Sequence, residues 1–124
     1  MRQIRITAGP VSVIAHLDDN PTADAIWEAL PIQGRANTWG DEIYFEVPVF
    51  VEPSGEAREA VAVGELGYWP PGHAFCIFFG RTPASRNDEP RAASAVNVFG
   101  RAAGDATVFR QVASGETVFI ERIE

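Results

Sequence analysis

The segment GYWPPGHAFCIFFGRTP, residues 67–83, decides the fold class of this chain. It places a run of aromatic and aliphatic side chains, residues 74–79, between two turns that are rich in proline and glycine. A short apolar run bounded by such turns is typical of a strand that is covered on both faces. The segment therefore predicts a central β-strand with shaped loops at its two ends.

The sequence on either side predicts further short strands and one helix. Residues 3–17 alternate apolar and polar side chains around a Gly-Pro turn, which predicts a hairpin. Residues 20–30 predict a short helix, because Asn20 can cap it and Pro21 suits the first helical position. Further strands are expected at residues 42–47, 60–63, 96–99, 106–112 and 117–123, and a mobile surface loop is expected at residues 84–95.

About eight short strands with one clear helix, and no alternation of strands with helices, predict an all-β barrel or sandwich. A chain of 124 residues, of which 46% are hydrophobic and 22% charged, is long enough to bury one core. We therefore expect a single domain over residues 1–124.

The strand at residues 42–47 predicts two different faces, because alternate side chains of a strand point in opposite directions. Ile43 and Phe45 are expected in the core, together with Phe75, Ile77 and Phe79 of the central strand. The other face carries Glu42, Tyr44 and Glu46, and we expect solvent to cover most of it.

Several motifs occur in an order that is found in one group of small bacterial and archaeal domains. They are WEALP at residues 27–31, WGDEIYF at 39–45, GYWP at 67–70, FFGRTP at 78–83 and NVFGR at 97–101. Together they resemble the TM1367-like branch of the cyclophilin-like proteins, roughly over residues 4–122. The resemblance implies a cyclophilin-like closed β-barrel with one or two short helices, in a group whose function is largely unassigned.

Charge and residue usage exclude several classes of function. A net charge of −7 disfavours nucleic acids and anionic membranes as partners. All ten basic residues are arginine, which excludes mechanisms that need a Schiff-base or P-loop lysine. The single cysteine, Cys76, is interpreted as a buried core residue. It cannot form an intramolecular disulfide, and the first residues lack the apolar run of a signal peptide, so a cytoplasmic protein is expected.

The spacing of polar residues indicates no complete catalytic or metal site. His16 and His73 lack a third ligand at a suitable spacing, so neither a metal nor a cofactor is expected. No serine has the GxSxG context of a nucleophile. Asp41 with Glu42, or Glu42 with Glu46, could act as an acid–base pair, but a solvated strand face is the favoured interpretation.

Aromatic side chains outside the expected core are better candidates for ligand contact. Tyr44 shares its strand face with two glutamates, and the turn at residues 67–72 presents two rings and places His73 at the barrel rim. The alternative is that Trp39 and Trp69 fill the ends of the barrel. The predicted ligand-binding residues are Tyr44, Tyr68, Trp69, His73, Phe78 and Arg101.

The favoured function is the binding of a small molecule or short peptide, without established catalysis. The first alternative is a divergent peptidyl-prolyl isomerase that uses Arg81 or Arg101. However, the chain lacks the Phe-His-Arg motif and the glutamine-glycine stretch of the cyclophilins that isomerise X-Pro bonds. The second alternative is an accessory subunit of a metabolic enzyme, by analogy with cyclophilin-like folds in amide-hydrolysing complexes.

Overall fold

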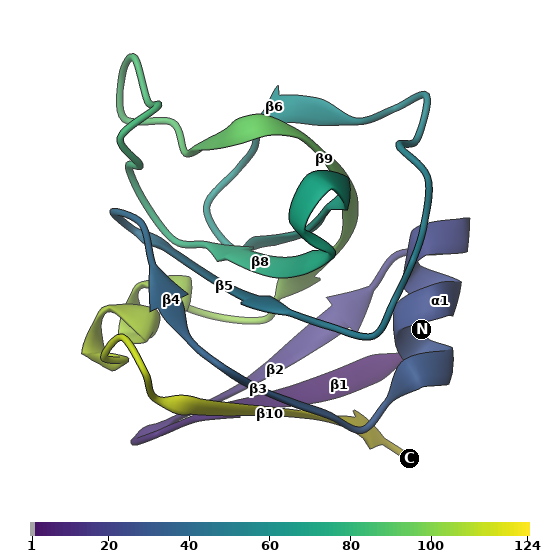
Figure 1. The fold of residues 1–124 in the computed structure, drawn as a ribbon. Helices are drawn as coiled ribbons and strands as arrows, with labels where there is room; N and C mark the ends of the chain where they lie inside the picture. The colour runs from purple at the N-terminus through teal and green to yellow at the C-terminus, as the bar shows by residue number, and fades with distance from the viewer. Residues whose placement is uncertain (1) are drawn as a thin grey trace.

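Antiparallel strands dominate the computed structural model, which describes residues 2–124 (Figure 1). Within these residues lie ten strands: β1 (Gln3–Ala8), β2 (Val11–Leu17), β3 (Ile32–Arg35), β4 (Asn37–Thr38), β5 (Glu42–Glu46), β6 (Arg58–Ala60), β7 (Glu65–Trp69), β8 (Ala74–Phe78), β9 (Arg91–Ala102) and β10 (Thr117–Ile123). They are accompanied by one α-helix, α1 (Pro21–Ala29), and two 3-10 helices, η1 (Pro70–Gly72) and η2 (Ala106–Gln111). The expectation of a mainly β fold with few short helices is confirmed.

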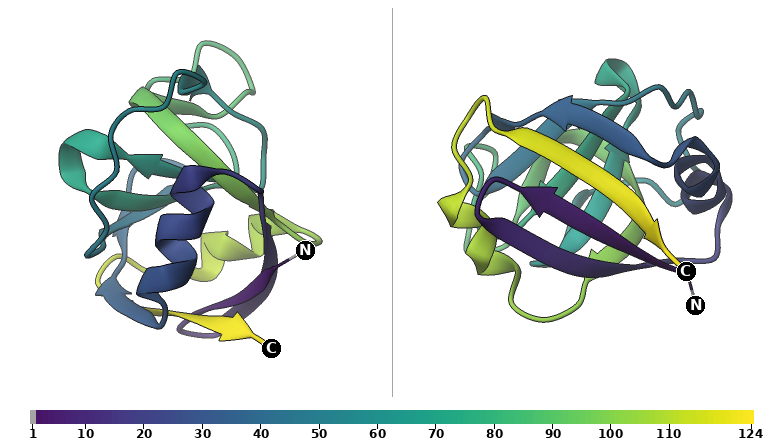
Figure 2. Two further views of the ribbon diagram at one scale, coloured as in Figure 1. Left: turned by 90° about the vertical axis from the view of Figure 1, so that its right-hand side faces the viewer. Right: turned by 90° about the horizontal axis from the view of Figure 1, so that it is seen from below.

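The strands form one sheet in the order β3-β10-β1-β2-β9-β7-β8-β5-β4, and β6 pairs with β9 outside this path. The two end strands, β3 and β4, follow each other in the chain and are separated by Ala36 alone. The sheet therefore curls around the interior, and its two end strands lie next to each other because they are consecutive in the chain (Figure 2). Because the hydrogen-bonded path through the described residues has two ends, the predicted closed barrel is not confirmed.

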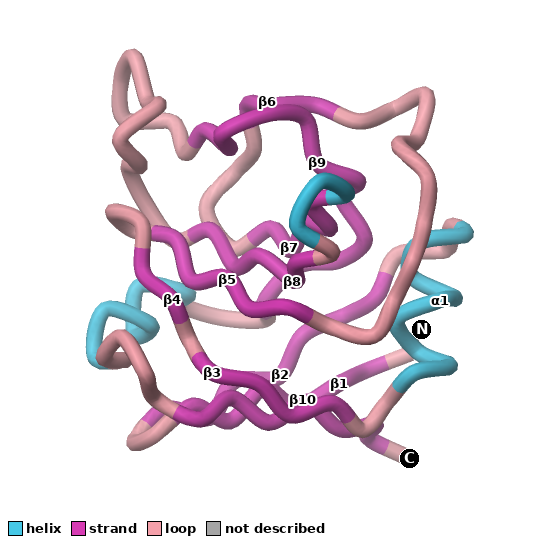
Figure 3. Tube along the Cα trace, viewed as in Figure 1, coloured by secondary structure: helices cyan, strands magenta, loops and turns pink. Residues whose placement is uncertain are grey.

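The main core fills the inside of this curl, and the helices lie at its periphery (Figure 3). The five side chains expected there are at most 3% exposed; they are Ile43, Phe45, Phe75, Ile77 and Phe79. The rings of Phe45 and Phe75 stack with centroids 5.1 Å apart, and Phe75 also meets the edge of Phe99 at 5.0 Å. Such aromatic contacts stabilise the core beyond the apolar area that they bury.

A second apolar cluster lies on the outer face of β5, β7 and β8. It consists of Val61, Ala74, Cys76, Phe78, Ala92 and Val96. The strand β9 explains this cluster, because only its later residues pair with β7 and β2, whereas residues 91–96 diverge from the main sheet and pair with β6. Figure 1 shows β6 and the first part of β9 above β8 and β5. The outer face of β5 is therefore covered by protein at Glu42 and partly at Tyr44, and the expectation of a solvated face holds only for Glu46.

The hairpin at residues 3–17 and helix α1 occur where they are predicted. Helix α1 begins because the Asn20 side chain accepts a hydrogen bond from the backbone N–H of Ala23 at 2.9 Å. In residues 2–124, every helix is too short or too polar to span a bilayer.

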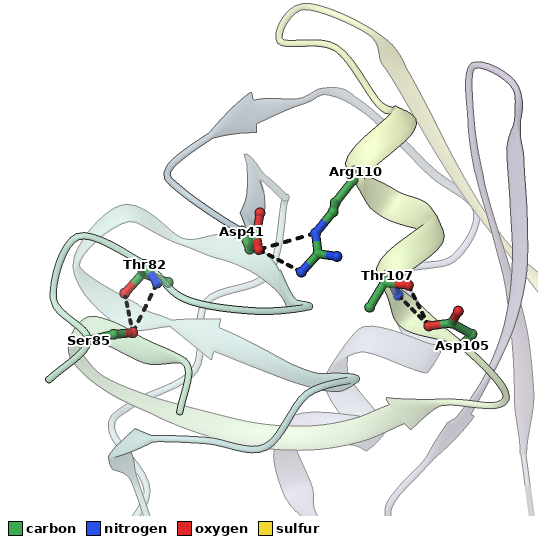
Figure 4. Close-up of polar contacts among 6 residues, drawn as sticks. All are labelled: Asp41, Thr82, Ser85, Asp105, Thr107 and Arg110. Atoms are coloured by element: carbon green, nitrogen blue, oxygen red, sulfur yellow. Dashed lines mark hydrogen bonds and ion pairs between the residues drawn. The ribbon is translucent and has the colours of Figure 1, made fainter. Parts of the chain in front are cut away.

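Three other sequence predictions are wrong. Residues 106–112 form η2 and not a strand, because Asp105 accepts hydrogen bonds from the backbone N–H and the hydroxyl of Thr107 and so caps a helical turn (Figure 4). The strand expected at residues 60–63 is β6, which ends at Ala60. The loop expected at residues 84–95 ends where β9 begins, at Arg91.

Candidate functional site

An apolar cavity of about 240 Å³ lies between the outer face of the sheet and the first part of β9. Trp39 lies in the turn before β5, and the other lining residues come from β5, β7, β8 and β9. The complete lining is Trp39, Glu42, Tyr44, Trp69, Cys76, Ala92, Ala93 and Val96. Concave, mostly apolar sites with few polar groups are typical of small-molecule binding.

Strand register explains why these side chains converge. The β5–β8 ladder places Tyr44 opposite Cys76 and Glu42 opposite Phe78, so all four lie on one face of the sheet. Strand β7 pairs with the other edge of β8 and brings Trp69 to the same face at the end of the ladder. From these three strands, the cavity is lined by Glu42, Tyr44, Cys76 and Trp69.

The absence of a side chain at Gly67 allows β9 to approach this floor closely. A Cβ atom at Gly67 would lie 2.8 Å from Cγ2 of Val96, closer than real Cβ atoms approach their neighbours. The β7–β9 ladder is irregular at the same place, between Leu66 and Gly67. Gly67 therefore sets the distance between the sheet and the residues of β9 that cover the cavity.

The indole of Trp69 is fixed in position on two sides. Its Nε1 atom donates a 2.7 Å hydrogen bond to the hydroxyl of Ser94 on β9. A Cβ atom at Gly72 of η1 would lie 2.8 Å from the indole ring, so glycine is required beneath it. The half-buried Trp69 ring is consequently held against the cavity before any ligand arrives.

Glu42 is the charged group of this cavity, and it is only 5% exposed. Its Oε1 atom has no hydrogen-bond partner among the residues that the structure describes. Burial raises the pKa of this carboxyl from 4.5 to about 7, and the nearby Cys76 thiol lowers it to a smaller degree. Burial, together with the negative charge of Glu42, also raises the pKa of the Cys76 thiol. The cavity thus contains a carboxyl that is partly ionised at neutral pH.

The other carboxylates that the sequence suggested as partners of Glu42 lie elsewhere. The Oδ2 atom of Asp41 accepts hydrogen bonds from Nη2 and Nε of Arg110, at 3.0 and 3.3 Å, outside the cavity (Figure 4). Glu46 is exposed at the far end of β5. In residues 2–124, no group of three or more histidine, cysteine, aspartate or glutamate side chains could hold a metal ion.

Of the six predicted ligand-binding residues, Tyr44 and Trp69 line this cavity. Tyr68 instead lies in the main core with no exposed area, and its hydroxyl donates a 2.6 Å hydrogen bond to the carbonyl of Val49. His73 lies beside it, with Nδ1 3.2 Å from the Tyr68 hydroxyl and its ring against that of Phe50.

The remaining two predicted residues are also separate from the lining. Phe78 is completely buried in the second apolar cluster. Arg101 is exposed and lines a different, polar cavity of about 360 Å³, which also contains the Arg58–Glu65 ion pair. The structure therefore brings together Tyr44 and Trp69 with six residues that were not predicted as ligand contacts: Trp39, Glu42, Cys76, Ala92, Ala93 and Val96.

Comparisons with known proteins agree on the fold. The model of a family described as "Cyclophilin-like" matches residues 2–121. No curated protein matches the chain. Among solved structures, the chain is similar to the solution structure of the hypothetical protein AF2241 from Archaeoglobus fulgidus, with 41% sequence identity and a TM-score of 0.82. This similarity covers 98% of the present chain and 95% of the other chain.

Proposed function

This chain belongs to the cyclophilin-like family, and we propose that it is a binding module that takes a small molecule or short peptide into the cavity under β9. One observation supports the proposal most strongly. The rings of Trp39, Tyr44 and Trp69 line a single cavity together with the buried carboxyl of Glu42. Apolar walls supply binding energy through burial, and an isolated polar group orients the ligand.

The size of the cavity limits the ligand. A volume of about 240 Å³ is slightly below the 300 Å³ or so that is usual for drug-sized ligands. The occupant is therefore a small molecule, or a single side chain of a peptide whose backbone stays outside. The fixed Trp69 ring reduces the ordering entropy that binding would cost.

Binding is a better explanation of this site than prolyl isomerisation. In cyclophilins that isomerise X-Pro bonds, an arginine hydrogen-bonds the twisting amide, and among residues 2–124 none of the arginines lines the cavity. Arg81 lies 3.8 Å from Asp88 in an exposed ion pair, and Arg101 lines the other cavity. An accessory role in a metabolic enzyme complex stays a hypothesis by analogy, which a pull-down from the native host would test.

We also propose that the chain lies in the TM1367-like branch of this family. In this proposal the curled sheet is a cyclophilin-like barrel whose two end strands, β3 and β4, are connected through Ala36. The motifs WGDEIYF and GYWP support this placement, because they supply four of the residues that line the cavity: Trp39, Glu42, Tyr44 and Trp69. The net charge of −7 favours a small ligand over nucleic acid or an anionic membrane, and the free thiol of Cys76 suits a cytoplasmic location.

A fragment screen by NMR tests the proposal, with the three indole N–H signals as built-in reporters. Trp39 and Trp69 line the cavity, whereas Trp27 lies on α1 against the guanidinium of Arg122. Fragments that bind should shift the signals of Trp39 and Trp69 and leave that of Trp27 unchanged. A chemically broad library that produces no shifts, or shifts only away from these two indoles, would overturn the proposal.

A pair of variants provides an independent check. Ala93→Phe places a ring at the cavity from an exposed position of β9, so the protein should fold and lose fragment binding. Ala113→Phe makes the same change at an exposed position that does not line the cavity, and it should bind fragments as the unmodified protein does.

A further inference from the structure

We propose that the cavity selects organic ammonium ions: its occupant is a small protonated primary amine with a flat apolar body. We build here on the proposed binding function and add the chemical class of the ligand. Three features of the cavity, as residues 2–124 form it, lead to this conclusion: a carboxylate oxygen without a hydrogen-bond donor, a set of aromatic walls and a lining without a positively charged side chain.

The first feature is Glu42, which lines the cavity and whose buried Oε1 atom lacks a hydrogen-bond donor within residues 2–124. A buried acceptor without a donor is unfavourable, because the protein loses the hydrogen bond that water would supply. The N–H groups of an ammonium ion would provide that donor and would neutralise the carboxylate. Benzoate and other anions would instead place a second negative charge beside Glu42.

The second feature is the aromatic character of the walls. Trp39, Tyr44 and Trp69 are half-buried and line the same cavity as Glu42. Faces of aromatic rings attract cations that lie within about 6 Å, and indole attracts them most strongly. An ammonium group inside the cavity would therefore be attracted by the carboxylate and by the aromatic walls that share its lining.

The third feature is the distribution of charge around Glu42. The other titratable groups of the lining are Tyr44 on β5 and Cys76 on β8, while Trp69 of β7, the lining residues of β9 and Trp39 carry no charge. Asp41, the preceding residue, is already paired with Arg110 outside the cavity. Within residues 2–124 the lining thus contains no cation of its own, so the ligand must supply it.

The proposed binding of an ammonium ion depends on the protonation state of the Glu42 carboxyl. Burial without a cationic partner raises the pKa of Glu42 to about 7. A bound ammonium ion stabilises the ionised carboxylate and so lowers this pKa. Below the pKa of the empty cavity, binding must therefore release a proton from Glu42, and affinity must increase as the pH rises towards neutrality.

Titration calorimetry with three phenyl ligands of similar size tests the proposal: benzylamine, benzyl alcohol and benzoate. At about pH 8, where Glu42 is ionised, benzylamine should bind at least about tenfold more tightly than benzyl alcohol, and benzoate should bind most weakly. Glu42→Gln should abolish the preference for benzylamine. Glu46→Gln, which alters an exposed carboxyl on the same strand, should retain it.

A second measurement uses the unmodified protein and does not depend on any variant. At about pH 6, benzylamine should release close to one proton per molecule bound, measured by calorimetry in two buffers of different ionisation enthalpy. Stronger binding by N-acetyl-lysine methylamide than by benzylamine would overturn the flat apolar body of the occupant and identify a lysine side chain of a peptide as the source of the ammonium group.

The outcomes separate this proposal from the binding function itself. Equal binding of benzyl alcohol and benzylamine, with both indoles of the cavity shifted and no proton release, would overturn the selection of cations and leave the binding module intact. If none of these ligands and no library fragment shifts the indoles of Trp39 and Trp69, both proposals are wrong.

Discussion

Replacing Glu42 with glutamine keeps the size of the side chain and removes its charge, so it should change how stability depends on pH. In the folded protein the pKa of Glu42 is raised from 4.5 to about 7, because the carboxyl is buried. A shift of about 2.5 pKa units corresponds to about 3 kcal/mol, since each unit is about 1.4 kcal/mol.

The sign follows from which state holds the proton more tightly. Between the two pKa values the folded protein binds the proton of Glu42 and the unfolded chain has released it. The contribution of this carboxyl to the free energy of unfolding is thus fully present below about pH 4.5 and is lost as the pH rises through about 7. Glutamine stays neutral at every pH, so the free energy of unfolding of Glu42→Gln does not fall over this pH range for this reason.

Urea unfolding at about pH 5 and about pH 8 measures this effect. Glu42→Gln should become more stable relative to the unmodified protein by about 2.5 kcal/mol between these two conditions. Glu46→Gln is the control, and its difference from the unmodified protein should stay nearly constant because this carboxyl is exposed. A difference for Glu42→Gln that varies by less than about 0.5 kcal/mol would refute the burial of this carboxyl.

Three further predictions concern the core, catalysis and the thiol. Phe79→Ala should cost about 3–5 kcal/mol of stability by urea unfolding, because Phe79 is buried against Phe109; a loss below about 1 kcal/mol would contradict this packing. The protein should give little or no acceleration of cis–trans exchange in X-Pro peptides by exchange NMR, and strong turnover that Arg81→Ala or Arg101→Ala abolishes would instead identify an isomerase. Because burial raises the pKa of its thiol, Cys76 should react with a chromogenic disulfide reagent at neutral pH only as the protein opens, and immediate complete reaction would show an accessible thiolate.

Much of the fold could be predicted from sequence where the pattern is local. The apolar run in residues 74–79 becomes β8, the alternation in residues 3–17 becomes β1 and β2, and the Asn20 cap begins α1. These elements succeed because side-chain periodicity and capping act over a few neighbouring residues. Strands β3 and β4 are too short to show a clear alternation of apolar and polar side chains. Strand β3 pairs with β10, which is far away in the sequence, and β4 pairs with β5 across a turn.

The errors of prediction arise where tertiary contacts or a local cap override strand propensity. Residues 106–112 contain the β-branched and aromatic side chains that are common in strands, but Asp105 accepts a hydrogen bond from the backbone N–H of Thr107 and starts η2. The sequence also placed Tyr68 on a turn, whereas it lies in β7 with its hydroxyl bonded to the backbone of Val49. An aromatic ring with a polar tip suits a ligand site and a core with one available carbonyl equally well.

The candidate site, too, could be predicted only where it depends on local sequence and not where it depends on tertiary contacts. The face that carries Glu42 and Tyr44 could be identified from alternation in β5, and Trp69 from its proline-rich turn. That this face is covered could not be predicted, because the cover is formed by residues 91–96 of β9, a stretch of small and polar side chains that reads as a loop. Gly67 was the available signal, since glycine inside a strand often marks a close approach of another segment.

The pKa of Glu42, measured by carbon NMR of its carboxyl in the empty protein and then with benzylamine, tests the central claim most directly. The claim is that a buried carboxyl without a cationic partner among the lining residues lies against apolar walls in a cavity that takes a cation. It predicts a pKa of about 7 in the empty protein and a lower value when benzylamine is bound. A pKa near 4.5 in the empty protein, or a raised value that benzylamine leaves unchanged, would contradict it.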